Sequence, residues 1–253
     1  MSKRLTGKVA VVTASTAGIG FAIAKRLGLE GASVVVSSRR RPNVEDAVKE
    51  LKSSGLDVSG IVCHVSKSED RDALINHTLE KYKKIDILVS NAATNPYFGD
   101  FLETPEAAWD KIFDTNVKAA FFLSKSVAPV MEKQGGGSII FVSSVGAFKP
   151  FPLIGAYGVS KTALLGLSQT LAHVLAPKKI RVNCIAPGVI QTHFSKALWE
   201  NEHISKEFVK EIPLGRFGTS EECAGAAAFL ASDDSAYVTG ETLFITGGLG
   251  SRL

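Results

Sequence analysis

Short apolar runs alternate along the chain with longer stretches in which apolar residues recur at helical spacing. The runs are rich in Val and Ile and predict buried strands. They lie at residues 8–13, 32–38, 85–90, 138–142, 180–185 and 243–245, and one further run ends at residues 62–65. The helical spacing covers residues 21–27, 44–52, 69–82, 109–131, 157–176 and 220–232. This alternation predicts an α/β fold. We expect one domain over residues 1–253, a Rossmann-like, doubly wound, parallel seven-stranded sheet with helices on both faces.

Composition and charge narrow the class of protein. Of the 253 residues, 45% are apolar and 21% are charged, as in ordinary globular domains. No apolar run approaches the roughly 18 residues of a membrane helix, so we expect no membrane contact. The run at residues 9–12 stops at Thr13, as expected of a first strand rather than a secretory signal. The net charge of +4 is scattered, which argues against nucleic acid as a partner.

The cysteines do not suggest a disulfide framework or a metal site. Cys63, Cys184 and Cys223 are odd in number and far apart, and the first two lie in predicted strands. We interpret them as buried thiols in a reducing compartment.

Candidate chemistry appears at Tyr157 and Lys161, which are four residues apart and share one face of a predicted helix. A nearby ammonium favours phenolate and lowers the tyrosine pKa, so that the phenol can transfer a proton near neutral pH. Ser144 follows the apolar run at residues 138–142, which places its hydroxyl at a sheet edge where open α/β sheets hold their sites. An ordinary amphipathic helix also explains the Tyr and Lys spacing when it is considered alone.

A second candidate site follows the first predicted strand. Residues 14–20 carry Gly18 and Gly20 and lead into a helical pattern, an arrangement whose free N–H groups suit a dinucleotide pyrophosphate. A plain turn that needs glycine for its geometry is the alternative. The second strand ends in Ser38 and Arg39 with no carboxylate, which favours the 2′-phosphate of NADP(H) over NAD. Residues 40–41, both Arg, are equally explained as solvated loop residues.

Further segments predict contacts with a ligand. Residues 91–93 are small and let a flat ligand approach the backbone, although a tight turn explains them as well. Asn116, inside a helical pattern, indicates a backbone or water contact, or simply an exposed residue. The apolar loop at residues 148–155 should line a substrate site. Residues 188–212 predict a lid over a lipophilic pocket, with two surface helices packed on the core as the alternative.

As a set, these motifs resemble the short-chain dehydrogenase/reductase family along nearly the whole chain. The family's glycine-rich turn is matched by Thr13, Gly18 and Gly20, and its Asn-Ala-Gly by Asn91 and Ala92. Its Pro-Gly and following threonine fall on Pro187, Gly188 and Thr192, and its catalytic residues fall on Asn116, Ser144, Tyr157 and Lys161. The sequence departs from the family at Ala14 and Ala93, where glycine is usual, and at His64, where an aspartate usually faces the adenine.

The resemblance implies hydride transfer from the nicotinamide of NADPH to a carbonyl carbon. Tyr157 would donate the proton and Ser144 would hydrogen-bond the carbonyl oxygen. Lys161 would lower the tyrosine pKa and hold the nicotinamide ribose, and Asn116 would anchor a relay water. The implied cofactor contacts are Thr13, Ser15, Gly18, Ile19, Gly20, Ser38, Arg39, His64, Val65, Asn91, Ala92, Tyr157, Lys161, Pro187, Gly188, Val189 and Thr192. The implied substrate contacts are Ser144, Phe151, Leu153, Tyr157 and Phe194, with no metal.

Within the family, several segments are similar to a group of peroxisomal NADPH-dependent carbonyl and retinal reductases. These segments are residues 13–16, 37–39, 63–65, 160–167 and the tail 251–253. The similarity implies reduction of aromatic ketones, α-dicarbonyls and retinal-like substrates. It also implies a homotetramer built through the helices at 109–131 and 157–176. The tail Ser-Arg-Leu is a variant of the Ser-Lys-Leu address read by the peroxisomal import receptor, and an unread tail would leave the protein in the cytoplasm.

Two other functions remain open at this point. A reductase of 3-oxoacyl thioesters would share the same catalytic set and would also suit a peroxisomal address. A cofactor-binding scaffold without turnover is the second alternative. The complete set of Asn116, Ser144, Tyr157 and Lys161 argues against the scaffold, because a non-enzyme has no reason to keep all four.

Overall fold

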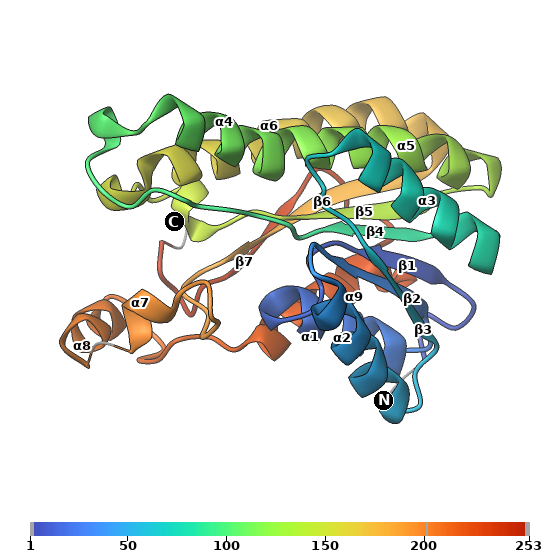
Figure 1. Cartoon of the computed structure of the whole chain (residues 1–253), viewed down its shortest axis with the longest axis horizontal. Coiled ribbons are helices and arrows are strands. Elements are labelled where there is room, and N and C mark those ends of the chain that lie inside the picture. Colours follow the sequence, from blue (N-terminus) through green and yellow to red (C-terminus); the bar gives the residue numbers. More distant parts are fainter. Residues whose placement is uncertain (1–2, 201, 251–253) are drawn as a thin grey trace.

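A parallel sheet of seven strands forms the centre of the protein (Figure 1). The computed structural model describes residues 3–200 and 202–250. In chain order the strands are β1 (Val9–Val12), β2 (Ser33–Ser38), β3 (Val58–Val62), β4 (Ile87–Ser90), β5 (Gly137–Val142), β6 (Ile180–Pro187) and β7 (Thr242–Ile245). Their order across the sheet is β3-β2-β1-β4-β5-β6-β7, with every neighbouring pair parallel. The predicted doubly wound α/β fold is confirmed.

Helices cover both faces of this sheet. They are α1 (Gly18–Leu29), α2 (Arg41–Ser53), α3 (Ser68–Tyr82), α4 (Glu106–Phe113), α5 (Ala119–Lys133), α6 (Gly155–Leu175), α7 (Lys196–Trp199), α8 (Glu202–Lys210) and α9 (Ser220–Ala231). Figure 1 shows α1, α2 and α9 on one face and α3 to α6 on the other, while α7 and α8 project at one end. Within the described residues, no helix combines the length and apolar character needed to cross a membrane.

The strands are apolar throughout because both of their faces are covered. Successive side chains of a strand point to opposite faces. Accordingly, Val34 and Val36 of β2 pack in one buried cluster with α1 and α9, whereas Val35 packs in a second cluster with α3, α5 and α6. This two-sided burial explains the near-continuous Val and Ile runs of the sequence.

The strand order reverses between β1 and β4, and this reversal places the candidate site. The chain runs from β1 outward to β3 and then returns to the other side of β1. Ligands of open α/β sheets bind in the crevice at such a point, beyond the carboxyl ends of the strands. Here the two strand ends are joined, because the Thr13 N–H donates to the Val89 carbonyl oxygen at 3.0 Å.

Two predicted elements differ from the structure. Residues 109–131 are not one helix, because a π-helical turn over Asp114–Lys118 separates α4 from α5. Such turns often mark functional sites, and this one contains Asn116. The strand predicted to end at residues 62–65 ends at Val62. The His64 N–H does not continue the sheet, because it donates to the Asp70 carboxylate at 2.7 Å.

Residues 188–212 fold into the segment that contains α7 and α8. A small cluster of Val145, Ile212, Phe217 and Leu249 lies beneath it, and the partly buried Trp199 and Phe208 are among the side chains packed against that cluster. Both helices therefore form and dock, and their role as a lid stays a prediction. The three cysteines are buried and free, as predicted. The predicted address at 251–253 lies outside the described residues.

The N-terminal segment is fastened by a buried carboxylate, which yields a stability prediction. The Glu30 side chain is 2% exposed and accepts hydrogen bonds from Arg4 Nε at 2.8 Å and Arg26 Nε at 2.6 Å. Burial raises the pKa of Glu30, but the hydrogen bonds from Arg4 and Arg26 outweigh burial and hold that pKa below its ordinary value. We expect Glu30→Gln to lower the free energy of unfolding by about 1.5–3 kcal/mol at neutral pH.

Denaturant unfolding measures this effect. Because the folded-state pKa is depressed, the stabilisation is present above the ordinary glutamate pKa and is lost as the pH falls through the depressed value. Glu132→Gln is the control, since Glu132 forms an exposed pair with Lys178 and should change stability by less than about 1 kcal/mol. Equal effects of the two substitutions on stability would contradict the stabilising role of the buried Glu30 carboxylate.

Candidate active site

Tyr157 and Lys161 lie together at the start of α6, where their spacing predicts them. Both side chains are buried, at 8% and 2% exposure. Lys161 Nζ lies 5.5 Å from the centre of the Tyr157 ring and donates to the Val142 carbonyl oxygen at 2.7 Å. Burial lowers the pKa of Lys161 to about 8. The ammonium is therefore held by the end of β5 and lies over the tyrosine ring.

The predicted lowering of the Tyr157 pKa by Lys161 is not found. Burial raises the pKa of Tyr157 to about 12, and the opposing influence is a hydrogen bond with Ser144. The physical reason is that the buried phenol loses hydration, while the Lys161 ammonium is directed to a carbonyl oxygen of the backbone. The phenol consequently keeps its proton at neutral pH.

Ser144 lies just beyond the carboxyl end of β5, as predicted. Its Oγ accepts a hydrogen bond from the Gly146 N–H at 3.0 Å and reaches Tyr157. The neighbouring Ser143 Oγ donates to the Lys161 carbonyl oxygen at 2.9 Å. These contacts bring a hydroxyl and a phenol together at one point of the crevice.

Asn116 is buried in the π-helical turn, which excludes the exposed alternative. Its Oδ1 accepts from the Thr94 N–H at 2.8 Å, and its Nδ2 donates to the Thr94 carbonyl oxygen at 3.1 Å and to Ser160 Oγ at 3.0 Å. The predicted backbone contact is thus present, and the relay water stays a prediction. Sequence reasoning missed Thr94 and Ser160, whose only signal is their place beside the Asn-Ala-Ala and Tyr motifs.

The glycine-bearing turn leads into a helix end that is open to an anion. Helix α1 begins at Gly18, whose φ of 55° is in the left-handed region, and its N-cap residue Ala17 makes no side-chain capping bond. The first N–H groups of α1 are therefore available to a ligand. The structure thus places the predicted Gly18, Ile19 and Gly20 at the crevice.

Asn91 clamps this turn from the end of β4. Its Nδ2 donates to the carbonyl oxygens of Thr13 and Ala14, both at 3.0 Å. Ala14 has a φ of 48°, a left-handed conformation that costs a residue with a Cβ about 1–2 kcal/mol. The chain keeps alanine where the family has glycine, and the bonds from Asn91 help to offset that cost.

Two predicted cofactor residues use their hydroxyls inside the protein. Thr13 Oγ1 accepts from the N–H groups of Asn91 and Ala92 at 3.0 and 3.1 Å. Ser15 Oγ donates to the Val12 carbonyl oxygen at 2.6 Å and accepts from the Ser37 N–H at 3.0 Å. Both residues are fully buried, so their side chains frame the crevice and do not point into it.

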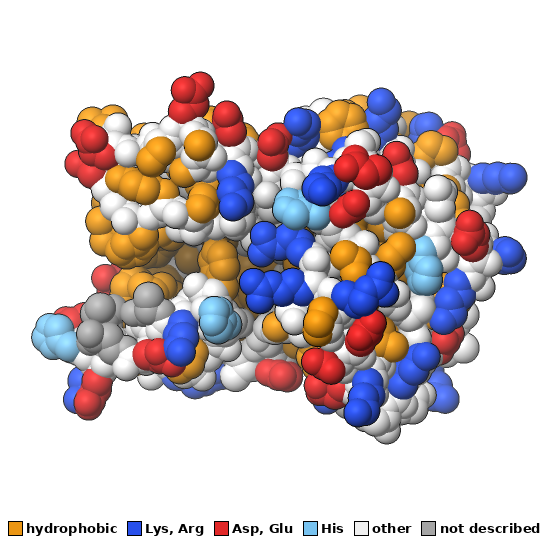
Figure 2. Space-filling model, viewed as in Figure 1, with side chains coloured by type: hydrophobic (Ala, Val, Ile, Leu, Met, Phe, Trp, Pro, Cys, Tyr) orange, Lys and Arg blue, Asp and Glu red, His pale blue; other side chains and the backbone are white. Residues whose placement is uncertain are grey.

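The ends of β2 and β3 carry the predicted 2′-phosphate contacts. Ser38 is half-buried and paired in register with Val62, and Arg39 is exposed. Within the described residues, Arg39 and Arg40 form no ion pair, whereas Arg41 lies 3.9 Å from Glu45. The half-buried His64 has its Nδ1 bonded to Ser66 Oγ at 2.8 Å, and Val65 is buried. Figure 2 shows Lys and Arg side chains gathered beside a hollow.

Hydrophobic side chains line that hollow (Figure 2). The Phe194 ring centre lies 5.7 Å from that of Tyr157, and Phe151 stacks on Phe208 of α8 at 6.2 Å. Leu153 is 50% exposed. The structure therefore brings Phe194 beside Tyr157 and Phe151 close to the Ser144 turn, and the contact of Leu153 with a substrate stays a prediction. It adds Phe101, which packs against Gly155 and which sequence reasoning missed.

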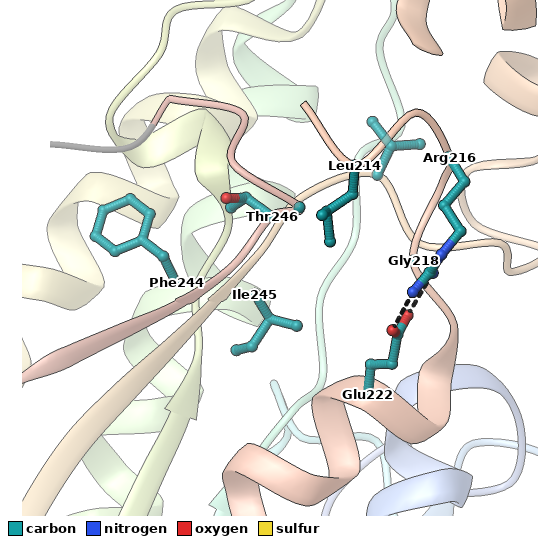
Figure 3. Close-up of a pocket in the computed structure, with 9 residues that line it drawn as sticks. Leu214, Arg216, Gly218, Glu222, Phe244, Ile245 and Thr246 are labelled. Carbon is teal, nitrogen blue, oxygen red and sulfur yellow. Dashed lines mark hydrogen bonds and ion pairs between the residues drawn. The ribbon is translucent and has the colours of Figure 1, made fainter. Parts of the chain in front are cut away.

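The segment after β6 closes the other side of the crevice. A Cβ placed on Gly18 would lie 3.3 Å from Thr192 Cγ2, so Thr192 faces the first turn of α1. Pro187 ends β6, and the Gly188 N–H donates to the Ile245 carbonyl oxygen at 2.9 Å. Val189 lines a pocket between this segment and β7 (Figure 3). Apart from Val189, that pocket contains none of the predicted site residues.

Figure 3 also shows why this pocket is a poor candidate for the chemistry. Its walls include Leu214 and Phe244, and Arg216 Nη2 lies 2.7 Å from Glu222 Oε1. The charged groups of the pocket are therefore already paired with each other. The residues predicted to be catalytic lie elsewhere, around the ends of β4 and β5.

Comparisons with known proteins agree with this arrangement. Residues 13–250 match the family model described as Enoyl-(Acyl carrier protein) reductase. The chain is 54% identical to Dehydrogenase/reductase SDR family member 4 of Oryctolagus cuniculus, over 98% of this chain and 96% of that protein.

Two solved structures are also similar along nearly the whole chain. A 7α-hydroxysteroid dehydrogenase complexed with NADH and 7-oxo glycochenodeoxycholic acid has a TM-score of 0.94 and 35% identity, covering 100% of this chain and 98% of that one. A candidate NAD(P)-dependent gluconate 5-dehydrogenase from Beutenbergia cavernae, with bound NADP at low occupancy, has a TM-score of 0.92 and 32% identity, covering 98% and 99%.

The close approach at Gly20 yields a prediction for this site. A Cβ at Gly20 would lie 2.4 Å from Asn91 Nδ2 and 2.5 Å from the Ala14 carbonyl oxygen, both too short for a contact. We expect Gly20→Ala to displace Asn91 and to destabilise the fold by about 1–3 kcal/mol, measured by thermal unfolding. Gly225→Ala in α9 is the control, because its new Cβ would come no closer than 4.0 Å to Arg26. That change should be neutral or stabilising by up to about 1 kcal/mol, and a neutral Gly20→Ala would refute the clamp.

Proposed function

This chain belongs to the short-chain dehydrogenase/reductase family, and on that premise we propose that it is an NADP(H)-dependent carbonyl reductase. It is an oxidoreductase of this type, and solved relatives bind NADH or NADP. The observation that carries the proposal is the meeting of Ser144, Tyr157 and Lys161 at the sheet edge where α1 also begins. The reaction is reversible, and its reverse oxidises alcohols.

The polypeptide fits the nicotinamide cofactor at three points. The N–H groups at the start of α1 suit the pyrophosphate, and the small residues after β4 allow a close approach. Arg39 offers a cation that forms no ion pair with the residues that the structure describes. Bound NADPH supplies the hydride. Lys161 would hold the nicotinamide ribose, and Gly188 and Thr192 would hold the nicotinamide side.

Proton transfer is the task of the chain's own residues. Because the pKa of Tyr157 is raised to about 12, its phenol carries the proton that a reduction must deliver. Ser144, which is already hydrogen-bonded to Tyr157, would donate a hydrogen bond to the carbonyl oxygen of the substrate as negative charge develops there. The alkoxide that forms is far more basic than a phenolate, so it takes the Tyr157 proton despite the raised pKa.

The substrate class follows from the apolar rim. Phe151, Leu153 and Phe194 suit aromatic ketones, α-dicarbonyls and retinal-like carbonyls, in which an apolar body adjoins the reacting group. The similar 7α-hydroxysteroid dehydrogenase structure holds 7-oxo glycochenodeoxycholic acid, in which a ketone also adjoins an apolar body. Reduction of a 3-oxoacyl thioester, which would use the same catalytic set, is the second candidate. Parallel assays on a free ketone and a 3-oxoacyl thioester separate the two.

Assembly and location belong to the same proposal. We infer a homotetramer joined through α5 and α6, where Phe121, Val159 and Val174 are exposed, and light scattering tests it. We also infer import into peroxisomes through the tail at residues 251–253. Imaging of a fluorescent fusion with and without these three residues tests that address.

The proton donor gives the first prediction. Tyr157→Phe keeps the buried ring and removes the transferable proton, so we expect turnover to fall by about two to four powers of ten with NADPH binding retained. NADPH absorbance at saturating ketone measures turnover. Tyr82→Phe on α3, whose hydroxyl bonds the exposed Asp57 at 3.2 Å, should stay within about twofold of the parent. Turnover of Tyr157→Phe near the parent value would disprove the mechanism.

Cofactor choice gives the second prediction. Removing the hydrogen bond from a charged group costs about 1.5–3 kcal/mol, so Arg39→Ala should raise KM for NADPH roughly ten- to a hundredfold and leave NADH nearly unchanged. Arg41→Ala, which removes a 77% exposed cation paired with Glu45, should have little effect. Ser38→Asp should invert the preference by repelling the 2′-phosphate. A parent that uses NADH as readily as NADPH, with a ratio unmoved by Ser38→Asp, would contradict this account.

A further inference from the structure

The turn after β6, at residues 190–195, is held by a side chain that comes from α7. Trp199 Nε1 donates to the Thr192 carbonyl oxygen at 3.0 Å. Ser195 Oγ also approaches that oxygen, at 3.2 Å, but a hydroxyl has one proton and its shorter contact is with the Ile190 carbonyl oxygen. Trp199 is therefore the effective donor to the Thr192 carbonyl.

Two N–H groups of this turn, those of Gln191 and Thr192, have partners within the turn or in the loop before α9. Ser195 Oγ accepts from the Thr192 N–H at 3.2 Å. The Gln191 N–H donates to the Gly218 carbonyl oxygen at 2.9 Å, and the Gly218 N–H donates to the Val189 carbonyl oxygen at 3.0 Å. The hydrogen bond from Trp199 therefore connects this turn directly to a side chain of α7.

The indole that makes this bond is packed against a small apolar cluster next to Ser144. It is one of the partly buried side chains packed on the cluster of Val145, Ile212, Phe217 and Leu249. Val145 directly follows Ser144 in the chain. When α7 docks on that cluster, the indole N–H is brought to Thr192.

Thr192 in turn sets the width of the crevice at the end of α1. Its methyl carbon lies where a Cβ on Gly18 would be only 3.3 Å away. A shift of Thr192 would therefore change the space beside the N–H groups that begin α1. Docking of α7 and the shape of the proposed cofactor site are therefore linked through the Thr192 carbonyl group, in addition to the contacts that Thr192 makes with Ser195, the residue before α7.

We propose that Trp199 is a positioning residue that couples docking of α7 to the grip of Thr192 on the dinucleotide. The inference rests on the proposed function, because it places a dinucleotide in the crevice. Coupling between two events is reciprocal. If the docked helix improves nucleotide binding, bound nucleotide must stabilise the docked helix by the same factor.

The test compares Trp199→Phe, which keeps an aromatic ring and removes the N–H donor, with the full-length parent. One neutral hydrogen bond contributes about 0.5–1.5 kcal/mol, so Kd for NADPH by calorimetry should rise roughly 2- to 13-fold. KM for NADPH should rise with Kd, and kcat should change by less than about twofold. Trp109→Phe on α4, which stacks on Phe113 at 4.7 Å, is the matched control and should leave Kd unchanged.

Hydrogen exchange supplies a readout that does not depend on turnover. Amides of residues 190–195 should exchange about 2- to 13-fold faster in Trp199→Phe without nucleotide, and NADPH should restore less protection than in the parent. Unchanged Kd, or a lower unfolding temperature alone, would reduce Trp199 to a packing residue and overturn the coupling. If the parent does not bind NADPH, the proposed function fails. In that case, unchanged exchange in Trp199→Phe would also overturn the tie to Thr192, whereas faster exchange would uphold it.

Discussion

The candidate site depends on how the end of β5 is fastened to the first turns of α6. Lys161 is a buried cation, and burying a charge is costly unless a hydrogen-bond partner is in place. Its ammonium finds that partner in the Val142 carbonyl oxygen at 2.7 Å, and Ser143 Oγ binds the Lys161 carbonyl oxygen in return at 2.9 Å. These two bonds fix the strand that carries Ser144 against the helix that carries Tyr157. The hydroxyl and the phenol meet as a result.

The same arrangement explains the charge state of the phenol. With the ammonium committed to the backbone, burial dominates, and the pKa of Tyr157 rises to about 12. A protonated phenol is the form that a carbonyl reduction consumes. Across the crevice, two side-chain amides bind the backbone in a similar way. Asn91 holds the strained turn at Ala14, and Asn116 holds Thr94, so the walls of the crevice are fixed by protein groups.

The sequence was sufficient to predict the fold and the meeting of Ser144, Tyr157 and Lys161, because Val and Ile runs and motif spacing report them directly. It could not show the π-helical turn at Asn116, which depends on a contact with Thr94 that lies 22 residues away. It also gave the wrong sign for the Tyr157 pKa, since a spacing of four residues fixes proximity and does not fix where an ammonium points or how deeply a phenol is buried. The sequence also did not show that the hydroxyls of Thr13 and Ser15 bind the protein backbone, because a motif match does not specify the direction of a hydroxyl.

Deuterium transfer tests the central claim most directly. The parent enzyme would be given NADPH carrying deuterium at the transferable position of its nicotinamide, together with an aromatic ketone or an α-dicarbonyl. Mass spectrometry of the product alcohol measures the label. The account predicts one deuterium on the carbinol carbon of each product molecule, with the hydroxyl proton drawn from solvent through Tyr157. An alcohol formed without deuterium on that carbon, or no reduction of any carbonyl in the series, would contradict it.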